Sequence, residues 1–251
     1  AMQVRPHFWM YLPQRRDTAA DRIREEQIPF CVNDQKGALV SLVSDLISTM
    51  RMEGSKRRLS LVEVGANYGD CTLLVAAISR QEHWQMNATL FEAHPETKLV
   101  LESNLIMNGV EAIVKQKAVY SSVGDRLILV SHRSSAHASL SGFGHALLRP
   151  AIRGGNAHLF EVETTTLDAQ FPDASLVDVL LIGINGAEIK LLEGAQRFFT
   201  SGNAPRFVVA MTWHWEAYRR LLESYGYTFL REEHFDGTVW AIAAKAQAAY
   251  G

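Results

Sequence analysis

Apolar and polar positions along the chain form blocks with two different periods. Short apolar runs, typical of buried strands, are followed by segments whose apolar positions recur at helical spacing. The predicted elements between residues 59 and 225 are, in chain order, strand 59–66, helix 71–82, strand 88–93, helix 96–107, strands 112–120, 126–131, 160–166 and 177–184, helix 187–199, strand 207–211 and helix 216–225. The run VDVLLIGI at 177–184 is apolar almost throughout, as in a parallel strand that is buried on both faces. The alternation predicts an α/β fold with a doubly wound, mostly parallel sheet.

The last predicted elements are two strands joined by a tight turn. Tyr227–His234 and Thr238–Ala244 flank the turn Phe235-Asp236-Gly237, and Asp-Gly between two strand patterns is a strong hairpin signal. An antiparallel hairpin after a series of parallel strands predicts one antiparallel strand near an edge of the sheet.

Two segments lie outside the alternating pattern. Residues 1–55 combine an aromatic stretch, a polar stretch and a helical pattern at 37–52, and we expect an N-terminal helical extension or cap there. Residues 132–159 are rich in Ser, His and Gly, and long irregular segments in compact domains are usually lids, binding loops or disordered regions. We expect residues 1–251 to form a single domain with a long loop or lid at 132–159.

Composition and charge narrow the classes of partner. The 251 residues are 47% apolar and carry a formal charge of −2, which argues against a surface for nucleic acid. No apolar run is long enough to cross a bilayer, and the start of the chain has no signal-peptide pattern. Two cysteines, Cys31 and Cys71, make no disulfide framework and suit a reducing compartment. We therefore expect a cytoplasmic protein with a small-molecule partner, no nucleic acid and no membrane, and the sequence leaves homo-oligomer formation open.

The stretch LVEVGANYGD at 61–70 is the strongest chemical signal. It places a glycine-rich turn after the first strand, and ligands bind at such turns in α/β sheets. The turn lacks both the Gly-Lys-Ser/Thr of a P-loop and the glycine spacing of a dinucleotide site. Glu63 beside a tight turn suits a ligand that carries an amino group and a sulfonium, as S-adenosylmethionine does. A purely structural turn is the alternative.

Glu92 ends the second strand, next to this turn. A carboxylate in that place can accept hydrogen bonds from both hydroxyls of a ribose, and the alternative is a solvated loop acid. Because neighbouring parallel strands end at the same edge of a sheet, Glu63 and Glu92 together favour one cofactor site.

Four motifs occur in an order that resembles a known family. They are VEVGANYGD, FEAHPETKLVLESNLIMNG, TTTLDA and VDVLLIGINGAEIKLLEGAQRFF, and they resemble the FkbM family of S-adenosylmethionine-dependent methyltransferases over residues 59–227. The resemblance implies a class I methyltransferase fold, a Rossmann-like, mostly parallel sheet of seven strands that ends in an antiparallel hairpin. It also implies S-adenosyl-L-methionine as cofactor and methyl transfer to an oxygen of a small molecule or sugar. The cofactor-binding residues that it implies are Glu63, Gly65, Ala66, Asn67, Tyr68, Gly69, Glu92 and Ala93. Asn104 matches a family asparagine, for which we expect a structural role.

The chain departs from the family pattern where acids are expected. After the fourth strand the family usually reads Ile-Asp-Val-Glu-Gly-Ala-Glu, whereas this chain has Gly183 and Asn185 in place of the first two acids and keeps only Glu188. Glycine offers no ligand atom and an amide is a weak neutral ligand, so we expect no metal site.

General-base work would then fall to a histidine. His214 follows the fifth strand, and the pKa range of histidine suits catalysis near neutral pH. His214 is therefore the first candidate for a catalytic residue, and His132, His137 and His145 of the long loop are second choices. The residues that we expect to contact the substrate are Asn185, Trp213 and His137. The aromatic group around Trp213, with Trp215 and Tyr218, either lines a substrate pocket or packs in the core.

The function expected from these features is metal-independent O-methylation of a small-molecule or sugar-containing biosynthetic intermediate. Two alternatives stay open: a non-catalytic relative that binds S-adenosylmethionine, and an enzyme of the same fold with other chemistry. The sequence names neither the methyl acceptor nor the pathway, and it leaves open whether Gly183 and Asn185 abolish or redirect catalysis.

Overall fold

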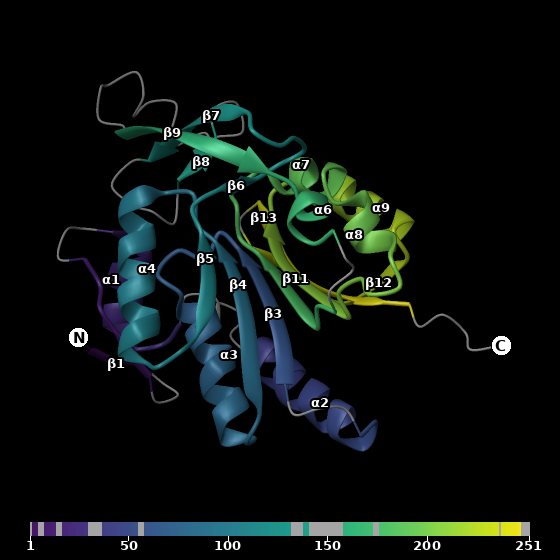
Figure 1. Ribbon diagram of the computed structural model, residues 1–251, viewed down its shortest axis with the longest axis horizontal. Helices are drawn as coiled ribbons and strands as arrows, with labels where there is room; N and C mark the ends of the chain where they lie inside the picture. Colours follow the sequence, from purple (N-terminus) through teal and green to yellow (C-terminus); the bar gives the residue numbers. More distant parts are fainter. Residues whose placement is uncertain are drawn as a thin grey trace.

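A computed structural model describes residues 2–4, 8–13, 17–29, 37–54, 58–131, 138–140, 158–172, 176–235 and 237–246. Its centre is a seven-stranded sheet with the order β12-β13-β11-β10-β3-β4-β5 (Figure 1). These strands are β3 (Arg58–Val64), β4 (Gln85–Phe91), β5 (Ala112–Lys115), β10 (Val179–Ile182), β11 (Phe207–Thr212), β12 (Tyr227–Phe235) and β13 (Thr238–Lys245). The strands from β11 to β5 are parallel to their neighbours, whereas β13 is antiparallel to both β11 and β12. The predicted mostly parallel sheet with one antiparallel strand near its edge is confirmed.

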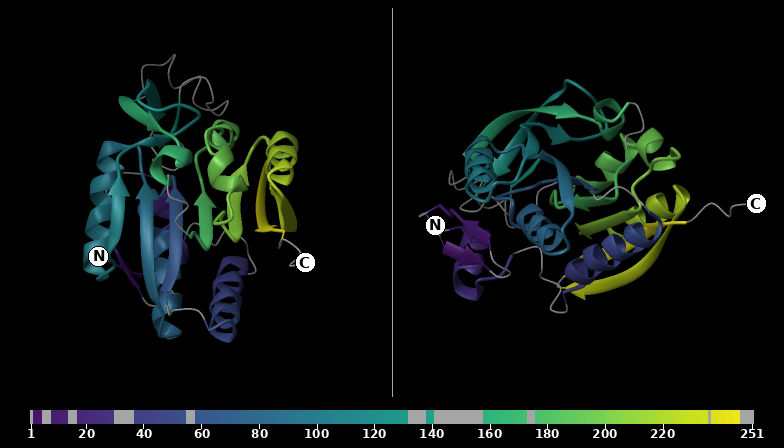
Figure 2. Two further views of the ribbon diagram at one scale, coloured as in Figure 1. Left: turned by 45° about the vertical axis from the view of Figure 1, so that its right-hand side comes forward. Right: turned by 60° about the horizontal axis from the view of Figure 1, so that its bottom comes forward.

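Helices cover both faces of this sheet, as Figure 2 shows. One layer contains α1 (Thr18–Glu26), α2 (Ala38–Met52), α3 (Asp70–Gln81) and α4 (Pro95–Met107). The other layer contains α6 (Leu167–Gln170), α7 (Glu188–Glu193), α8 (Gln196–Thr200) and α9 (Trp215–Ser224). Each layer buries its own apolar cluster against the sheet, which is why the strands are apolar on both faces.

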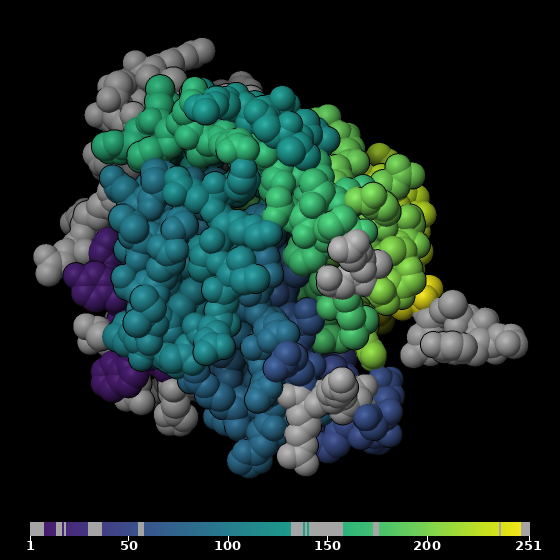
Figure 3. Space-filling model, in the orientation of Figure 1, coloured from purple at the N-terminus to yellow at the C-terminus, as the bar shows by residue number. Residues whose placement is uncertain are grey.

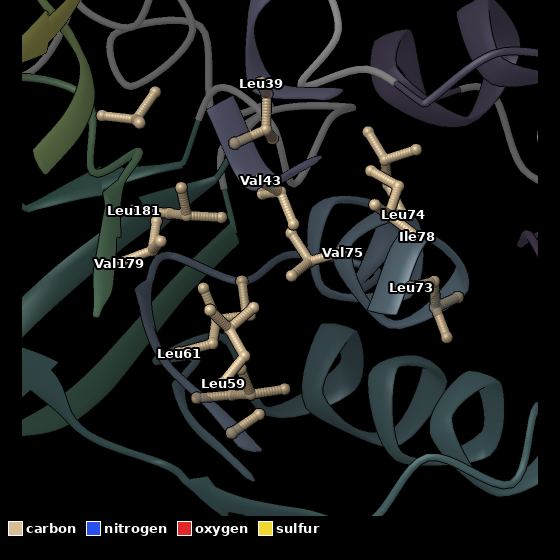
Figure 4. Close-up of a cluster of buried hydrophobic side chains, with 14 of the residues drawn as sticks. Leu39, Val43, Leu59, Leu61, Leu73, Leu74, Val75, Ile78, Val179 and Leu181 are labelled. Carbon is tan, nitrogen blue, oxygen red and sulfur yellow. The ribbon is translucent and has the colours of Figure 1, made fainter. Parts of the chain in front are cut away.

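The two-residue period of a strand explains how β3 serves both layers. Leu59 and Leu61 belong to the cluster under α2 and α3, whereas Val62 and Val64 belong to the opposite cluster, because successive side chains point to opposite faces. Figure 4 shows Leu59 and Leu61 among the side chains of the first cluster. Glu63 alternates with Val62 and Val64, so its carboxylate points toward α3.

A smaller accessory sheet lies over the carboxyl ends of the central strands. It has the order β6-β9-β7-β8, with β6 (Ala118–Val119), β7 (Arg126–Ser131), β8 (Ser139–Leu140) and β9 (His158–Thr165). In Figure 3 its teal and green segments form the upper part of the visible face. Of the predicted loop at 132–159, the structure describes only residues 138–140 and 158–159. His132, His137 and His145 therefore lie outside the described residues.

Asn104 of α4 and Asn108, which caps the end of this helix, hold the N-terminal segment that contains β1 (Met2–Val4) and β2 (Phe8–Met10). Asn104 accepts a hydrogen bond from the backbone N–H of Tyr11 (2.6 Å) and donates to the carbonyls of Tyr11 (3.1 Å) and Tyr68 (2.9 Å). Asn108 accepts from the N–H of Trp9 (2.8 Å) and donates to its carbonyl (2.6 Å). Asn104 thus links the N-terminal segment to the glycine-rich turn, which agrees with the structural role expected of it.

The predicted strand 112–120 is wrong in one respect, because the chain leaves the central sheet after Lys115. β5 pairs with β4, but β6 pairs with β9 of the accessory sheet. The backbone turns at this point, where the N–H of Lys117 donates to the carbonyl of Lys115 (3.0 Å). The polar residues Lys115-Gln116-Lys117 lie at this turn and separate the two short apolar runs.

The single helix predicted at 187–199 is also wrong, since α7 and α8 are separate helices. A Cβ atom at Gly194 would lie 2.8 Å from Cα of Ser121 and closer still to a carbonyl oxygen, so the chain approaches a neighbouring backbone there. The carboxylate of Asp168 accepts hydrogen bonds from the N–H groups of Arg197 (3.1 Å) and Phe198 (2.7 Å). A carboxylate at the start of α8 caps a new helix, so the helical pattern is interrupted.

Candidate functional site

A cavity opens at the carboxyl edge of the central sheet, where β3, β4, β10 and β11 end. The turns after these strands form its floor, and they contribute Gly65, Asn67, Glu92 and Gly183 among others. Residues of the accessory sheet and its margin cover the opposite side. We call the three residues Leu129, Ala138 and Leu140 the roof.

The glycine-rich turn is packed tightly between two neighbouring strands. The N–H groups of Gly65 and Ala66 both donate to the carbonyl of Phe91, at 2.9 and 3.0 Å. Gly65 has φ +80°, and a Cβ atom there would lie 2.9 Å from the carbonyl carbon of Gly183 and closer still to its oxygen. Only glycine suits this position, because the backbone is left-handed and the backbone of Gly183 fills the space beside it.

Glu63 is buried beneath this turn, at the end of β3. Its side chain is 4% exposed and accepts a hydrogen bond from the hydroxyl of Thr72 at the start of α3. Burial raises the pKa of Glu63 to about 8, the hydrogen bond from Thr72 lowers it in part, and nearby Asp70 raises it. A carboxyl group with such a pKa is stabilised in its charged form when a cation binds next to it.

Glu92 is held rigidly on the other side of the turn. One carboxylate oxygen accepts from the N–H of Asn67 and the other from the N–H of His94, both at 2.8 Å. Burial raises the pKa of Glu92 to about 7, although the two backbone hydrogen bonds lower it. Asn67 adopts the left-handed conformation, with φ +48°, which aims its N–H at this carboxylate. Each oxygen of Glu92 keeps a further lone pair that can accept a ligand hydroxyl.

The turn after β10 adjoins the glycine-rich turn. The N–H of Gly183 donates to the carbonyl of Val64 (2.9 Å), and Asn185 is left-handed with φ +49°. The side-chain amide of Asn185 donates to the carbonyl of Ala138 at 3.0 Å. Asn185 therefore connects the floor of the cavity to the roof.

Glu188 anchors the same turn from below. It is fully buried and accepts hydrogen bonds from the N–H of Gly186 (2.7 Å) and the hydroxyl of Thr212 (3.2 Å). Burial raises its pKa, while the hydrogen bonds and the nearby His214 lower it. Glu188 thus fixes the ends of β10 and β11 relative to each other.

A second, more open cavity lies between the start of α9 and the β12–β13 turn. His214 lines this cavity and not the first one, and its N–H donates to the hydroxyl of Thr212 (3.1 Å). The two cavities are lined from opposite faces of the β11–β13 strand pair, because successive residues of a strand point to opposite sides of the sheet. Met211 pairs with Trp240 and both line the first cavity, whereas Val239, next to Trp240, lines the second.

Comparison with known proteins identifies the family. A family model described as the methyltransferase FkbM domain matches residues 63–229, more than half of the chain. The chain belongs to this family. The family resemblance predicted from the four motifs is therefore confirmed. A search of the curated proteins finds no match to the chain.

One solved structure agrees with the FkbM assignment at the level of the fold. The methyltransferase FkbM from Methylobacillus flagellatus KT is 12% identical, with a TM-score of 0.50 over 75% of this chain and 44% of that protein. The chain thus spans less than half the length of that relative. TrmK of M. capricolum, in complex with S-adenosyl-homocysteine, is 9% identical, with a TM-score of 0.44 over 83% of this chain and 67% of that protein. At 12% identity the first similarity shows a methyltransferase fold and nothing about the substrate.

The FkbM domain brings most of the predicted cofactor residues into the first cavity. Those that line it are Glu63, Gly65, Ala66, Asn67, Glu92 and Ala93, together with Asn185 from the predicted substrate set. Tyr68 and Gly69 are not among the lining residues. Tyr68 is 1% exposed, and a Cβ atom at Gly69 would lie 2.6 Å from Cδ1 of Leu101, so both pack under the turn.

The remaining predicted residues lie elsewhere. Trp213 lines the second cavity with His214, and His137 lies outside the described residues. Tyr218 is buried in the apolar cluster under α9, and Trp215 packs edge-on against Phe229 with ring centroids 4.9 Å apart. For these two aromatic residues the structure supports the packing alternative, although Trp215 also lines the second cavity.

Several lining residues were not predicted. Asp70 lines the first cavity and is 4% exposed, and it is the last letter of LVEVGANYGD, so the motif itself could have indicated it. Lys117 lines the cavity as well and pairs with Glu163 of β9. Nothing local in the sequence marks the roof residues, because the pairing of β7 with β8 and β9 brings them there.

Metal-ligating clusters and membrane-spanning helices are both absent from the described residues. In this part of the chain no group of three or more His, Cys, Asp or Glu side chains is arranged to hold a metal ion. Within the same residues, no helix has the length and apolar character needed to cross a membrane. Cys71 lies at the start of α3 and is half-buried, whereas Cys31 lies outside the described residues.

Proposed function

We propose that this FkbM domain is an S-adenosyl-L-methionine-dependent methyltransferase that methylates a hydroxyl oxygen of a small molecule without a metal ion. The observation that carries the proposal is the placement of two buried carboxylates on either side of one glycine-rich turn. Glu63 lies under the turn, and Glu92 is fixed beside it by the N–H groups of Asn67 and His94. Both line one cavity at the carboxyl edge of a parallel sheet, where α/β proteins bind their ligands.

The chemistry of these groups suits the two ends of the cofactor. Glu92 can accept hydrogen bonds from both ribose hydroxyls, because its oxygens are already oriented by backbone donors. Glu63 and Asp70 form an acidic patch that suits the amino group of the methionine moiety. The bare backbone at Gly65 lets the cofactor approach closely.

When bound, S-adenosylmethionine supplies a methyl group on a sulfonium, which needs no further activation. The protein's task is to exclude water and orient the acceptor, and the apolar residues Ile184, Met211 and Trp240 suit that task. We propose that His214 takes the proton of the acceptor hydroxyl, with the acceptor reaching from the first cavity into the second. A metal-independent mechanism is supported by the neutral side of the cavity, where Gly183 and Asn185 offer no carboxylate.

Isothermal titration calorimetry with S-adenosylhomocysteine, with and without EDTA, tests cofactor binding. We expect the same affinity in both conditions. In Glu92→Ala we expect the affinity for S-adenosylhomocysteine to fall by about 100-fold, because two charge-assisted hydrogen bonds to the ribose are lost. We expect its circular-dichroism spectrum to match that of the wild type. Absence of binding by the wild type at high micromolar ligand contradicts the proposal.

A second candidate is a domain that binds S-adenosylmethionine without methyl transfer, or that uses it for other chemistry. The replacement of two family acids by Gly183 and Asn185 motivates it. Mass spectrometry of reactions with a panel of hydroxyl acceptors separates the candidates, because a gain of one methylene unit marks methyl transfer. Tight binding without any methylated product across the panel favours the second candidate.

A further inference from the structure

We infer that Asn185 is a positioning residue whose side-chain amide latches the roof over the cofactor cavity, a role that the family's glutamate at this position cannot perform. The amide donates to the carbonyl of Ala138 at 3.0 Å. An ionised carboxylate has no proton to donate, so a glutamate would face this carbonyl oxygen with a second acceptor. The replacement of an acid by Asn185 therefore exchanges a charge in the cavity for a structural hydrogen bond.

The backbone presents this amide in a fixed direction. Asn185 has φ +49°, a left-handed conformation that asparagine adopts more readily than glutamate does. The next residue, Gly186, also has a positive φ of +102° and donates its N–H to buried Glu188 at 2.7 Å. Glu188 in turn accepts from Thr212 of β11. The turn is thus anchored to the sheet from below. On its upper side the amide of Asn185 bonds to the roof, beside the apolar packing of Ile184 and Ala187 in the cluster that contains the roof residues.

Among the described residues, the roof is attached to the accessory sheet through the pairing of β8 with β7. β8 (Ser139–Leu140) pairs with β7 at two positions, Leu129 with Leu140 and Val130 with Ser139. Leu129 and Leu140 are both buried and line the cavity with Ala138. Within the described residues this ladder is short, so the bond from Asn185 adds a directional contact to the apolar packing that holds Leu140.

The position of the roof over the cavity indicates why this latch matters. The cavity encloses about 180 Å³, below the roughly 300–1,000 Å³ of typical ligand pockets. The roof covers one side of this partly open cavity. A looser roof would therefore speed ligand exchange, as the opening of lids does in many enzymes.

Hydrogen exchange on the unliganded protein tests the latch directly. Asn185→Asp keeps the shape of the side chain but loses the donor, and Asn185→Gly suits the positive φ. In both variants we expect the amides of the 138–140 segment and of its partner Val130 to exchange about fivefold faster, as for the loss of one neutral hydrogen bond. Asn185→Glu should behave like Asn185→Asp. Asn87→Asp is the matched control, because Asn87 is exposed in β4 and the change in charge is the same.

Ligand kinetics give a readout that a merely structural role would not change. This arm rests on the proposed function, since the probe is S-adenosylhomocysteine. By stopped flow we expect association and dissociation rates to rise together by about fivefold in Asn185→Asp and Asn185→Gly, with the melting temperature unchanged. Unaltered exchange at 138–140 in both variants, or wild-type exchange in Asn185→Glu, overturns the inference. If the wild type does not bind the probe, the proposed function fails, while the exchange experiment still decides the latch.

Discussion

The contact between the glycine-rich turn and the turn after β10 makes a sharp prediction at three glycines. Gly65 has φ +80° and a Cβ atom there would collide with the backbone of Gly183, whereas Gly124 has nearly the same φ of +82° but nothing within 4 Å. Gly183 has an ordinary φ, and the nearest atom to its Cβ position is 3.9 Å away. The three sites separate backbone strain from steric exclusion.

The expected losses of unfolding free energy follow from these differences. An alanine in the left-handed region costs about 1–2 kcal/mol, so Gly124→Ala should lose about 1 kcal/mol once the smaller entropy of its unfolded chain is counted. Gly65→Ala adds overpacking worth about 1–3 kcal/mol, for a total of about 2–4 kcal/mol. Gly183→Ala should stay within about 0.5 kcal/mol of the wild type.

Chemical denaturation followed by circular dichroism measures all three variants, and calorimetry with S-adenosylhomocysteine shows which of them keep the cavity. Of the two variants at left-handed positions, we expect Gly65→Ala to lose more than tenfold in ligand affinity and Gly124→Ala to keep its affinity. Equal losses of stability for Gly65→Ala and Gly124→Ala would show that the close approach to Gly183 has no energetic weight, and the packing argument would be refuted.

Three further predictions concern buried polar groups. Burial raises the pKa of Glu63 from 4.5 to about 8, so between these pH values the folded protein holds a proton that the unfolded chain has released. The free energy of unfolding is therefore unaffected by this group below pH 4.5 and falls as the pH rises toward 8, by on the order of 5 kcal/mol. Glu63→Gln should therefore flatten the fall in unfolding free energy between pH 5 and 8, and an unchanged slope contradicts the assignment. Asn104→Ala should cost about 2–3 kcal/mol, because it leaves the buried carbonyl of Tyr68 without its donor, and it should weaken S-adenosylhomocysteine binding. Asn108→Ala, which affects Trp9 but not the turn, should leave that affinity unchanged, and equal weakening in both variants contradicts the link. Asp168→Ala should lower the free energy of unfolding by about 1–2 kcal/mol in chemical denaturation, because α8 loses its cap. An unchanged free energy of unfolding would show that this cap is dispensable.

Local patterns sufficed for the central sheet and for the floor of the cavity. The turn from Glu63 to Asp70 and the acid Glu92 follow directly from apolar runs that end in glycine or before a proline, and chain alternation places them at one edge. These features are encoded within a few residues of each other, which is why the family and the cofactor-side residues could be inferred from the sequence.

The roof and the fate of the replaced acids depend on contacts that local patterns do not encode. Asn185 donates a hydrogen bond to Ala138, which is 47 residues away in the sequence, and no pattern near either residue predicts this contact. The break at Gly194 likewise depends on Tyr120 and on the distant cap from Asp168. The sequence places His214 just after a strand, but the side of the sheet to which its cavity belongs follows only from the three-dimensional position of α9 and the hairpin.

The insertion of β13 between β11 and β12 has a consequence for synthesis. The ribosome delivers β11 and then β12 before it delivers β13, yet β13 lies between them and supplies Trp240 to the wall of the first cavity. A nascent chain that already carries the complete glycine-rich turn, Glu63 and Glu92 therefore lacks a wall of its cavity until residues 238–245 emerge. The ability to bind ligand should therefore appear late and abruptly during translation. Nascent chains arrested before residues 238–245 emerge should not retain S-adenosylhomocysteine, whereas chains arrested after they emerge should retain it.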